Sequence, residues 1–236
     1  MRMRLDKYLS DTLGLSRREA KQLLREGRVL VDGQSAARGE TQLDPAQAAV
    51  TLDGRSLAAP TGFYLMLHKP AGVLTATRDS AQPTVLDLLP PEYRHRQPFP
   101  VGRLDKDTTG LLLLTDDGDF AHRLIAPKSH VSKLYEAELA AALSASDVAA
   151  FEAGLTLRDG TQCLPARLEL LGDRLVRVEV YEGRYHQVRR MLASRGAPVL
   201  TLRRLRIGGL WLDATLMEGA CRMLREREIE LALSAK

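Results

Sequence analysis

The apolar positions of this chain fall into short segments separated by turn-forming residues. The most apolar of them, Leu111–Leu114, lies between Gly110 and the dipeptide Asp117-Gly118. Four leucines in a row between turn formers predict a strand that is buried on both faces. Two other segments, Val131–Leu139 and Leu175–Val180, alternate apolar and polar positions, which is typical of strands with one buried face.

Near the N-terminus the spacing of apolar positions is helical. It predicts one helix over Arg4–Leu13 and a second from Ser16 to about Glu26, each stopped by a glycine. Ser16 and Glu19 have the spacing of a capping box for the second helix. Arg18, Lys21 and Arg25 then form one exposed basic stripe. Because Val29–Val31 leads into Asp32-Gly33, a strand and a tight turn should follow.

The remaining pattern predicts mostly strands with helices between them. Phe63–Leu67 and Val199–Ile207 are expected strands, and a short helix is expected from Pro83-Thr84 to Pro90-Pro91. Further helices are expected over Arg184–Leu192 and Leu224–Leu233. Since no strand–helix–strand rhythm recurs, the fold class is α+β on a mixed, largely antiparallel sheet.

A linker is expected at Leu57–Gly62, where small residues surround Pro60. It divides the chain into a small N-terminal domain, residues 1–59, and a larger domain, residues 62–236.

Composition narrows the class of protein. The apolar fraction is 44%, which is normal for a globular protein, and no run approaches the ~18 apolar residues of a membrane helix. The N-terminus lacks a signal-peptide core, so we expect a cytoplasmic protein and no membrane partner. Cys163 and Cys221 lack metal-ligand spacing and are expected to be buried thiols. A monomer is the default expectation.

The net charge of +4 is unevenly distributed. Residues 1–30 hold eight basic and four acidic residues, and residues 184–206 hold seven arginines and no acid. Two basic regions far apart in the sequence suggest that a polyanion is the ligand.

Asp105 is one candidate for chemistry, because it lies just before the leucine strand, where a rigid element can hold a catalytic group. Position alone does not separate it from the other aspartates that flank this strand, which are typical turn formers and helix caps. A metal-dependent nuclease or phosphotransferase built on Asp105, Asp107, Asp116 and Asp119 is one rival interpretation. Two-metal chemistry needs carboxylates that converge, whereas the leucine strand separates these. A second rival is a non-catalytic RNA-binding assembly factor in which Asp105 is structural.

The N-terminal region resembles a known RNA-binding module. Arg4 to Leu9, Ser16 to Ala20 and Gly27 to Gly33 match the module named after ribosomal small-subunit protein four. The resemblance covers residues 3–50 and implies structured RNA as the ligand, bound by basic residues of this module. These are Arg4, Lys7, Arg17, Arg18, Lys21, Arg25 and Arg28.

The rest of the chain resembles the class of pseudouridine synthases that carries this module. The matching segments are Gly102–Asp105, Thr108–Leu111, Thr115–Gly118, Lys69-Pro70, Lys133–Tyr135, Glu182–Met191 and Arg206–Leu210. Within the class, the chain is similar to the enzymes that act on 16S ribosomal RNA, through residues that include His122, Pro127 and His130. It departs from the usual threonine or serine at Arg225, so the last helix must be capped by another residue.

The resemblance implies a role for each matching residue. Asp105 would be the nucleophile or otherwise essential carboxylate, Tyr135 would pack on the target base, and Arg189 would pair with Asp105. Arg103 would fill the space left by the flipped base or hold its phosphate. Lys133, His186 and Arg190 are further expected RNA contacts.

The implied reaction is the isomerisation of a uridine in 16S ribosomal RNA to pseudouridine. It involves no redox change and no net hydrolysis, so no cofactor and no metal are expected. The expected partner is 16S ribosomal RNA within a small-subunit assembly particle. A 23S ribosomal RNA or transfer RNA substrate is the alternative within the same class.

Overall fold

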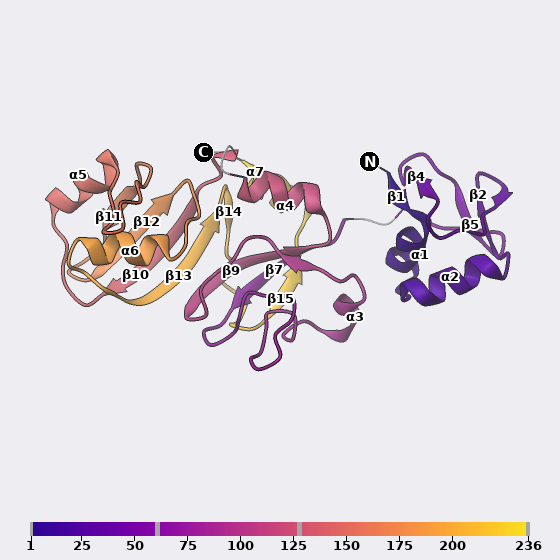
Figure 1. The fold of residues 1–236 in the computed structure, drawn as a ribbon, viewed down its shortest axis with the longest axis horizontal. Helices are drawn as coiled ribbons and strands as arrows, with labels where there is room; N and C mark the ends of the chain where they lie inside the picture. The colour runs from indigo at the N-terminus through magenta and orange to yellow at the C-terminus, as the bar shows by residue number, and fades with distance from the viewer. Residues whose placement is uncertain (1, 60–61, 127–128, 235–236) are drawn as a thin grey trace. The chain divides into compact units, whose positions relative to one another are not determined.

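A computed structural model of the chain describes residues 2–59, 62–126 and 129–234, which form two compact units (Figure 1). One unit comprises Met1–Phe63 together with Pro90–Pro98, and the other comprises Tyr64–Leu89 together with Phe99–Lys236. The division of the sequence into residues 1–59 and 62–236 stays a prediction. The predicted linker includes residues 60–61, which lie outside the described residues.

The first unit is built on two helices, α1 (Leu5–Leu13) and α2 (Arg17–Arg25). Both predicted caps are confirmed: Gly14 ends α1 in the left-handed conformation, and Ser16 and Glu19 form the capping box of α2. Leu5 and Leu9 of α1 pack with Leu24 of α2 in a buried core. This packing places the polar face of α2 on the surface.

Short strands complete the first unit. A four-stranded sheet has the order β3-β2-β5-β6, and β1 pairs with β4. The predicted turn at Asp32-Gly33 joins β2 to β3, and both residues have positive φ, as this tight hairpin requires. The bounds are β1 (Met3–Arg4), β2 (Val29–Val31), β3 (Gln34–Ser35), β4 (Gln42–Leu43), β5 (Val50–Leu52), β6 (Arg55–Ser56), and helix α3 (Pro91–Arg94) also belongs here.

The second unit contains a nine-stranded sheet whose main path is β11-β12-β10-β13-β9-β7-β15. All of its pairings are antiparallel except that of β13 with β9, which confirms the mixed, largely antiparallel prediction. The bounds are β7 (Tyr64–Lys69), β8 (Phe99–Pro100), β9 (Thr108–Thr115), β10 (Lys133–Leu139), β11 (Arg167–Leu170), β12 (Leu175–Val180), β13 (Val199–Ile207), β14 (Leu210–Trp211) and β15 (Cys221–Met223).

The predicted leucine strand is β9, near the middle of this sheet. Leu111–Leu114 have no exposed surface, so the strand is buried on both faces as expected. The parallel pairing joins Thr108, Thr109 and Gly110 of β9 to Leu202–Arg204 of β13. We call this three-residue parallel pairing the seam, because it joins the strands β11, β12, β10 and β13 to the strands β9, β7 and β15.

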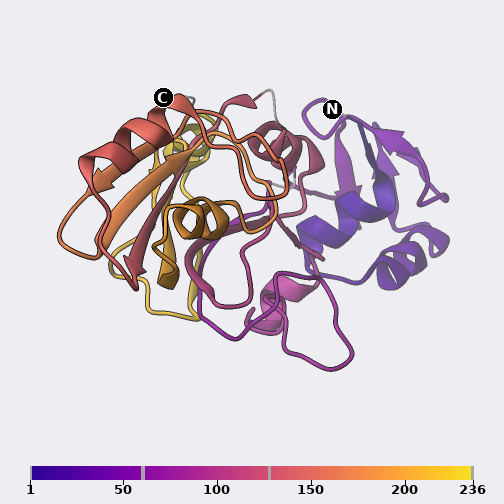
Figure 2. The same cartoon turned by 60° about the vertical axis from the view of Figure 1, so that its left-hand side comes forward.

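Helices cover the sheet on both sides of the seam (Figures 1 and 2). Helices α5 (Ala145–Ala153) and α6 (Gln187–Ser194) pack with β10 to β13 in one core cluster. Helices α4 (Gly118–Ile125) and α7 (Glu226–Leu233) pack with β7, β9 and β14 in another. The cap that Arg225 cannot provide comes from Glu228, whose carboxylate accepts a hydrogen bond from the Arg225 backbone N–H at 2.8 Å.

The helix expected from Pro83-Thr84 to Pro90-Pro91 is wrong. The backbone there bonds instead to Leu74, which donates to Pro83 and accepts from Val85, each at 2.9 Å. The Asp87 carboxylate accepts from both the backbone N–H and the hydroxyl of Thr84, which favours a turn. Helix formation begins only at Pro91, where the missing N–H costs nothing.

The helix expected over Arg184–Leu192 begins later, at Gln187. His186, its N-cap, is in the left-handed conformation with φ 47°, which a helix interior excludes. Cys163 is buried as expected, whereas Cys221 is only half-buried because it lies on the edge strand β15. Across the described ranges, no helix is long and apolar enough to span a membrane.

Candidate active site

Asp105 lies in the loop that leads into β9, at the seam. The loop is held from several sides: Thr75 Oγ1 donates to the Leu104 carbonyl at 2.7 Å, and the Thr108 N–H donates to the Asp105 carbonyl at 3.0 Å. The Asp105 side chain is 31% exposed and lines an open cavity of the second unit. The backbone of this loop is therefore fixed while the carboxylate stays accessible.

Two basic groups face the Asp105 carboxylate. Arg189 Nε lies 3.6 Å from Oδ2, and His186 Nε2 lies 3.4 Å from Oδ1. Arg189 comes from the first turn of α6, whereas His186 reaches the carboxylate because its left-handed backbone turns it there. A non-glycine residue in this conformation costs of order 1–3 kcal/mol, and such strain concentrates at functional sites. The sequence predicts His186 as an RNA contact that shares a face with Arg189, and the structure places it beside Asp105.

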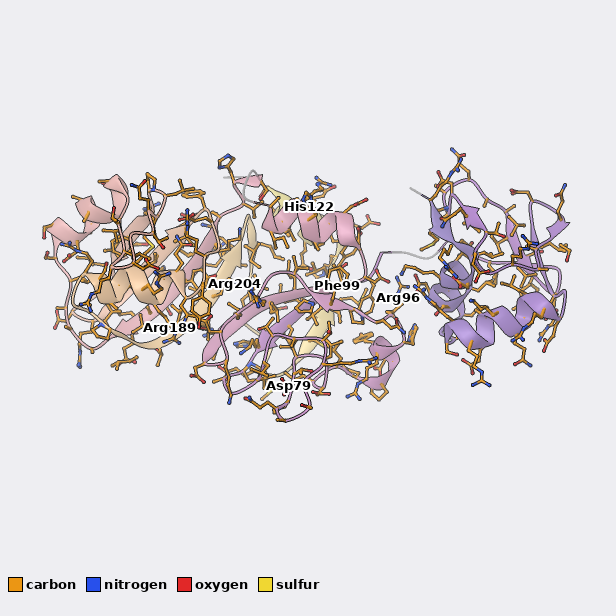
Figure 3. The ribbon with its side chains drawn as sticks, in the orientation of Figure 1. Asp79, Arg96, Phe99, His122, Arg189 and Arg204 are labelled. Carbon is orange, nitrogen blue, oxygen red and sulfur yellow. The ribbon has the colours of Figure 1, made fainter. Side chains whose placement is uncertain are left out.

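Tyr135 of β10 lines the same cavity. Its hydroxyl accepts a hydrogen bond from Arg204 Nη1 at 3.4 Å, and the Arg204 guanidinium lies 5.9 Å from the ring centroid. Arg204 of β13 is only 4% exposed, and Figure 3 labels it together with Arg189. Arg204 is not predictable from the local sequence, because its partners are 69 and 93 residues away along the chain.

Lys69 belongs to the matching segment Lys69-Pro70, but the sequence predicts no role for it in the site. It ends β7 and has no exposed surface. Its Nζ donates to the carbonyls of Pro70, Lys106 and Thr108 at 3.0, 2.9 and 3.0 Å. Lys69 therefore ties the end of β7 to the backbone that directly follows Asp105. Burial lowers the pKa of Lys69 to about 8, although the charges of Asp107 and Asp105 oppose the shift.

Stability should consequently rise with pH in the alkaline range. Burial also lowers the pKa of Lys133 to about 8, with Arg204 adding to the shift. Between pH 7.5 and 9 the unfolded chain holds protons that these folded lysines release, so the free energy of unfolding increases by about 1 kcal/mol per lysine. The melting temperature should rise by ~2–4 °C for each of them.

Thermal unfolding followed by circular dichroism at fixed ionic strength measures this rise. Lys133→Met should show about half of it, since one of the two lysines is gone. Burial raises the pKa of Cys163, so this thiol lowers the free energy of unfolding as the pH approaches 9. The rise in stability is therefore best measured below pH 9. A melting temperature that falls from pH 7.5 to 8.5 contradicts the prediction.

Asp107 is two residues from Asp105, but the other two acidic residues of the rival metal site lie far from it along β9. Asp116 and Asp119 lie beyond the opposite end of the eight-residue strand. Asp117 caps α4 by accepting from the backbone N–H groups of Asp119 and Phe120. Among the described residues, no group of three or more His, Cys, Asp or Glu side chains has the geometry to hold a metal ion.

Of the remaining predicted residues of the second unit, Arg103 and Lys133 lie at or beside the Asp105 cavity, whereas Arg190 does not. Arg103 is exposed and lines the Asp105 cavity. Lys133 lines a neighbouring cavity, which Arg103 and Tyr135 also line. Arg190 points elsewhere, since its guanidinium pairs with Asp159. Arg190 is therefore engaged within the protein.

In the first unit, ion pairs engage several predicted RNA contacts. Arg4 and Lys21 both pair with Glu40, at 3.1 and 2.8 Å. Lys7 pairs with Asp11 at 2.9 Å, and Arg28 with Asp53 at 2.6 Å. Three arginines of α2, by contrast, have exposed side chains, namely Arg17, Arg18 and Arg25.

Comparison with known proteins bears on both units. The model of the RNA pseudouridylate synthase family matches residues 63–194, and that of the S4 domain matches residues 3–47. A protein of Bacillus subtilis (strain 168) named uncharacterized RNA pseudouridine synthase YtzG is 43% identical over 233 residues, covering 97% of this chain and 98% of its own.

Two proteins named ribosomal small subunit pseudouridine synthase A are similarly close. That of Pseudomonas aeruginosa is 45% identical, covering 96% of this chain and 99% of its own. That of Escherichia coli (strain K12) is 42% identical, covering 96% and 98%. A crystal structure of a pseudouridylate synthase is 37% identical and superposes with a TM-score of 0.69, covering 98% of this chain and 99% of that one. The chain therefore belongs to the RNA pseudouridylate synthase family, whose reaction is an isomerisation within RNA, and it carries an S4 domain ahead of the synthase domain.

Proposed function

We propose that the protein converts one uridine of 16S ribosomal RNA into pseudouridine, with Asp105 as the essential carboxylate. The state of the two carboxylates in the cavity supports this assignment. Glu182 is saturated, accepting from Leu164, Gln187 and Arg184 at 2.7–2.9 Å. Asp105 faces its basic neighbours only at 3.4–3.6 Å, beyond the ~2.7–3.2 Å of a good hydrogen bond, so it retains capacity to bond substrate.

The chemistry requires such a group. The bond between uracil N1 and ribose C1′ breaks, and a bond between C5 and C1′ forms. C5 then loses its proton and N1 gains one, so atoms and electrons balance without an oxidant. A carboxylate can serve either by attack on the sugar or ring or by stabilising an oxocarbenium-like species.

The neighbours of Asp105 have distinct roles in this proposal. The target uridine leaves the RNA stack and enters the cavity, where Tyr135 packs against the base and its hydroxyl is available for proton movement. Arg189 and His186 orient the carboxylate. The bound RNA closes the open side and excludes water, which would otherwise hydrolyse the detached sugar.

The S4 domain supplies affinity in this proposal. Arg17, Arg18 and Arg25 contact phosphates of structured RNA, which positions the substrate without reading its sequence. The choice of 16S ribosomal RNA is supported by relatives named for the small ribosomal subunit, which span nearly the whole chain. We place the protein in the cytoplasm, acting as a monomer on a small-subunit assembly particle.

Mapping of pseudouridine tests the substrate assignment. The purified protein is incubated with unmodified transcripts of 16S and 23S ribosomal RNA and of transfer RNA, alone and assembled with ribosomal proteins. Carbodiimide-dependent primer extension then locates new pseudouridines. We expect a single new site in 16S ribosomal RNA. Product only in 23S ribosomal RNA or transfer RNA would assign the alternative substrate, and product in none would refute the activity.

A further inference from the structure

A second cavity lies next to the one that contains Asp105. The two cavities share Arg103, Tyr135 and Gly183 as lining residues. The second has a volume of about 110 Å³, whereas ~10–15 Å³ suffices for one water molecule. Three cations, Arg103, Lys133 and Arg204, line it, and no acidic residue is among the described residues that do so. This charge imbalance points to an anion.

Arg204 is incompletely satisfied in its buried position. Its Nε donates to the Leu111 carbonyl at 2.8 Å, and its Nη1 donates to Tyr135. Its Nη2 is buried and has no hydrogen-bond partner among the described residues. A buried guanidinium without a counter-charge is costly, and a bound anion offsets that cost.

Lys133 shares this situation. Its Nζ donates to the Val131 carbonyl at 2.7 Å and lies 3.5 Å from that of Leu124, both of which are uncharged acceptors. Arg204 is close enough to act with burial in lowering the pKa of Lys133. Two cations that repel each other in a partly dry cavity form a preorganised receptor for a phosphate.

We propose that this cavity binds a phosphodiester group of the substrate strand beside the flipped uridine, with Lys133 and Arg204 as its ligands. The proposal rests on the proposed function, since the shared Tyr135 places the phosphate next to the base that enters the Asp105 cavity. Half-exposed Ile125, at the rim, offers an apolar surface to the attached ribose. Arg204 thus serves twice, by holding the Tyr135 hydroxyl and by binding the strand.

Methylphosphonate substitution tests this site. A 16S ribosomal RNA fragment is assembled by ligation with one neutral methylphosphonate at each phosphate from two before to two after the target uridine. RNA binding is measured by fluorescence anisotropy at one fixed salt concentration, and conversion is measured under single-turnover conditions. The proteins are wild type, Lys133→Met, Lys133→Gln and Lys133→Arg. Arg174→Met serves as a matched control, because it removes one exposed charge at the distant start of β12.

One methylphosphonate position should weaken binding to wild type and to Arg174→Met by ~10-fold. The same position should change binding to Lys133→Met and Lys133→Gln by less than ~2-fold, since the partner is already absent, while Lys133→Arg keeps most of the effect. Equal losses in wild type and both neutral variants would overturn the proposal, as would insensitivity of wild type at every position. If wild type binds the fragment but does not convert the uridine located by the mapping experiment, the binding measurements still decide this site, while the mapping experiment decides the proposed function.

Discussion

Asp105→Asn is expected to lower the rate of isomerisation by at least ~10³-fold, which corresponds to about 4 kcal/mol of lost transition-state stabilisation. An amide is nearly isosteric with the carboxylate, but it has neither its charge nor its nucleophilicity. Because the Asp105 side chain is partly exposed and makes only long contacts with Arg189 and His186, its replacement should leave the fold intact. Binding of RNA should be unchanged or slightly tighter, since a negative charge is removed from a surface that faces phosphates.

Single-turnover conversion of 16S ribosomal RNA, RNA affinity and melting temperature together check this result. Asp119→Asn is the matched control, since Asp119 is an exposed aspartate beyond the opposite end of β9. It should retain full activity. Residual activity above ~10% in Asp105→Asn, with normal folding, would refute the role of Asp105 and favour a structural carboxylate.

Gly110→Ala is expected to destabilise the second unit by more than ~4 kcal/mol or to prevent its folding. Gly110 has φ 103°, which L side chains rarely adopt. A Cβ atom there would lie 2.2 Å from the carbonyl oxygen and 2.7 Å from the backbone nitrogen of Arg204. Since both are backbone atoms of the paired strand, they cannot move aside without breaking the seam.

The measurement is the melting temperature of the purified variant, which should fall by ~10 °C or more if the variant folds. Gly118→Ala is the control. Gly118 begins α4, has no positive φ, and a Cβ there meets nothing within 4 Å. Stability should stay equal or rise slightly, because alanine favours helix. A Gly110→Ala protein that melts within 2 °C of wild type would show that the two strands can separate cheaply.

The features of the fold that depend on neighbouring residues are predictable from the sequence. The capping box of Ser16 and Glu19, the turn at Asp32-Gly33 and the burial of the Leu111–Leu114 strand are all confirmed. Each results from the intrinsic preference of a few consecutive residues. The helix predicted after Pro83 fails because Leu74, which lies outside the segment, takes up its backbone hydrogen bonds.

The candidate site shows the same limit. Asp105 is one of several aspartates that flank the leucine strand, and the resemblance of Gly102–Asp105 to the synthase motif is what distinguishes it. Lys69 and Arg204 are not candidates from the sequence, because their role depends on hydrogen bonds to carbonyls 37 to 93 residues away along the chain. Lys69 and Arg204 are buried because of the positions of their strands in the sheet. The order of strands in a mixed sheet cannot be read from local periodicity.

The seam at Gly110 also bears on how the enzyme could change during evolution. The Asp105 carboxylate comes from one side of this pairing, while the Arg189 guanidinium and the His186 imidazole that face it, and the Tyr135 ring that lines the same cavity, come from the other. Replacing a buried side chain on either side of the seam can shift Asp105 relative to Arg189 and His186 by a fraction of an ångström, although the replaced side chain contacts none of these residues. Turnover could thus be tuned remotely, and inherited changes far from the RNA would carry catalytic consequences that inspection of the pocket alone would not reveal.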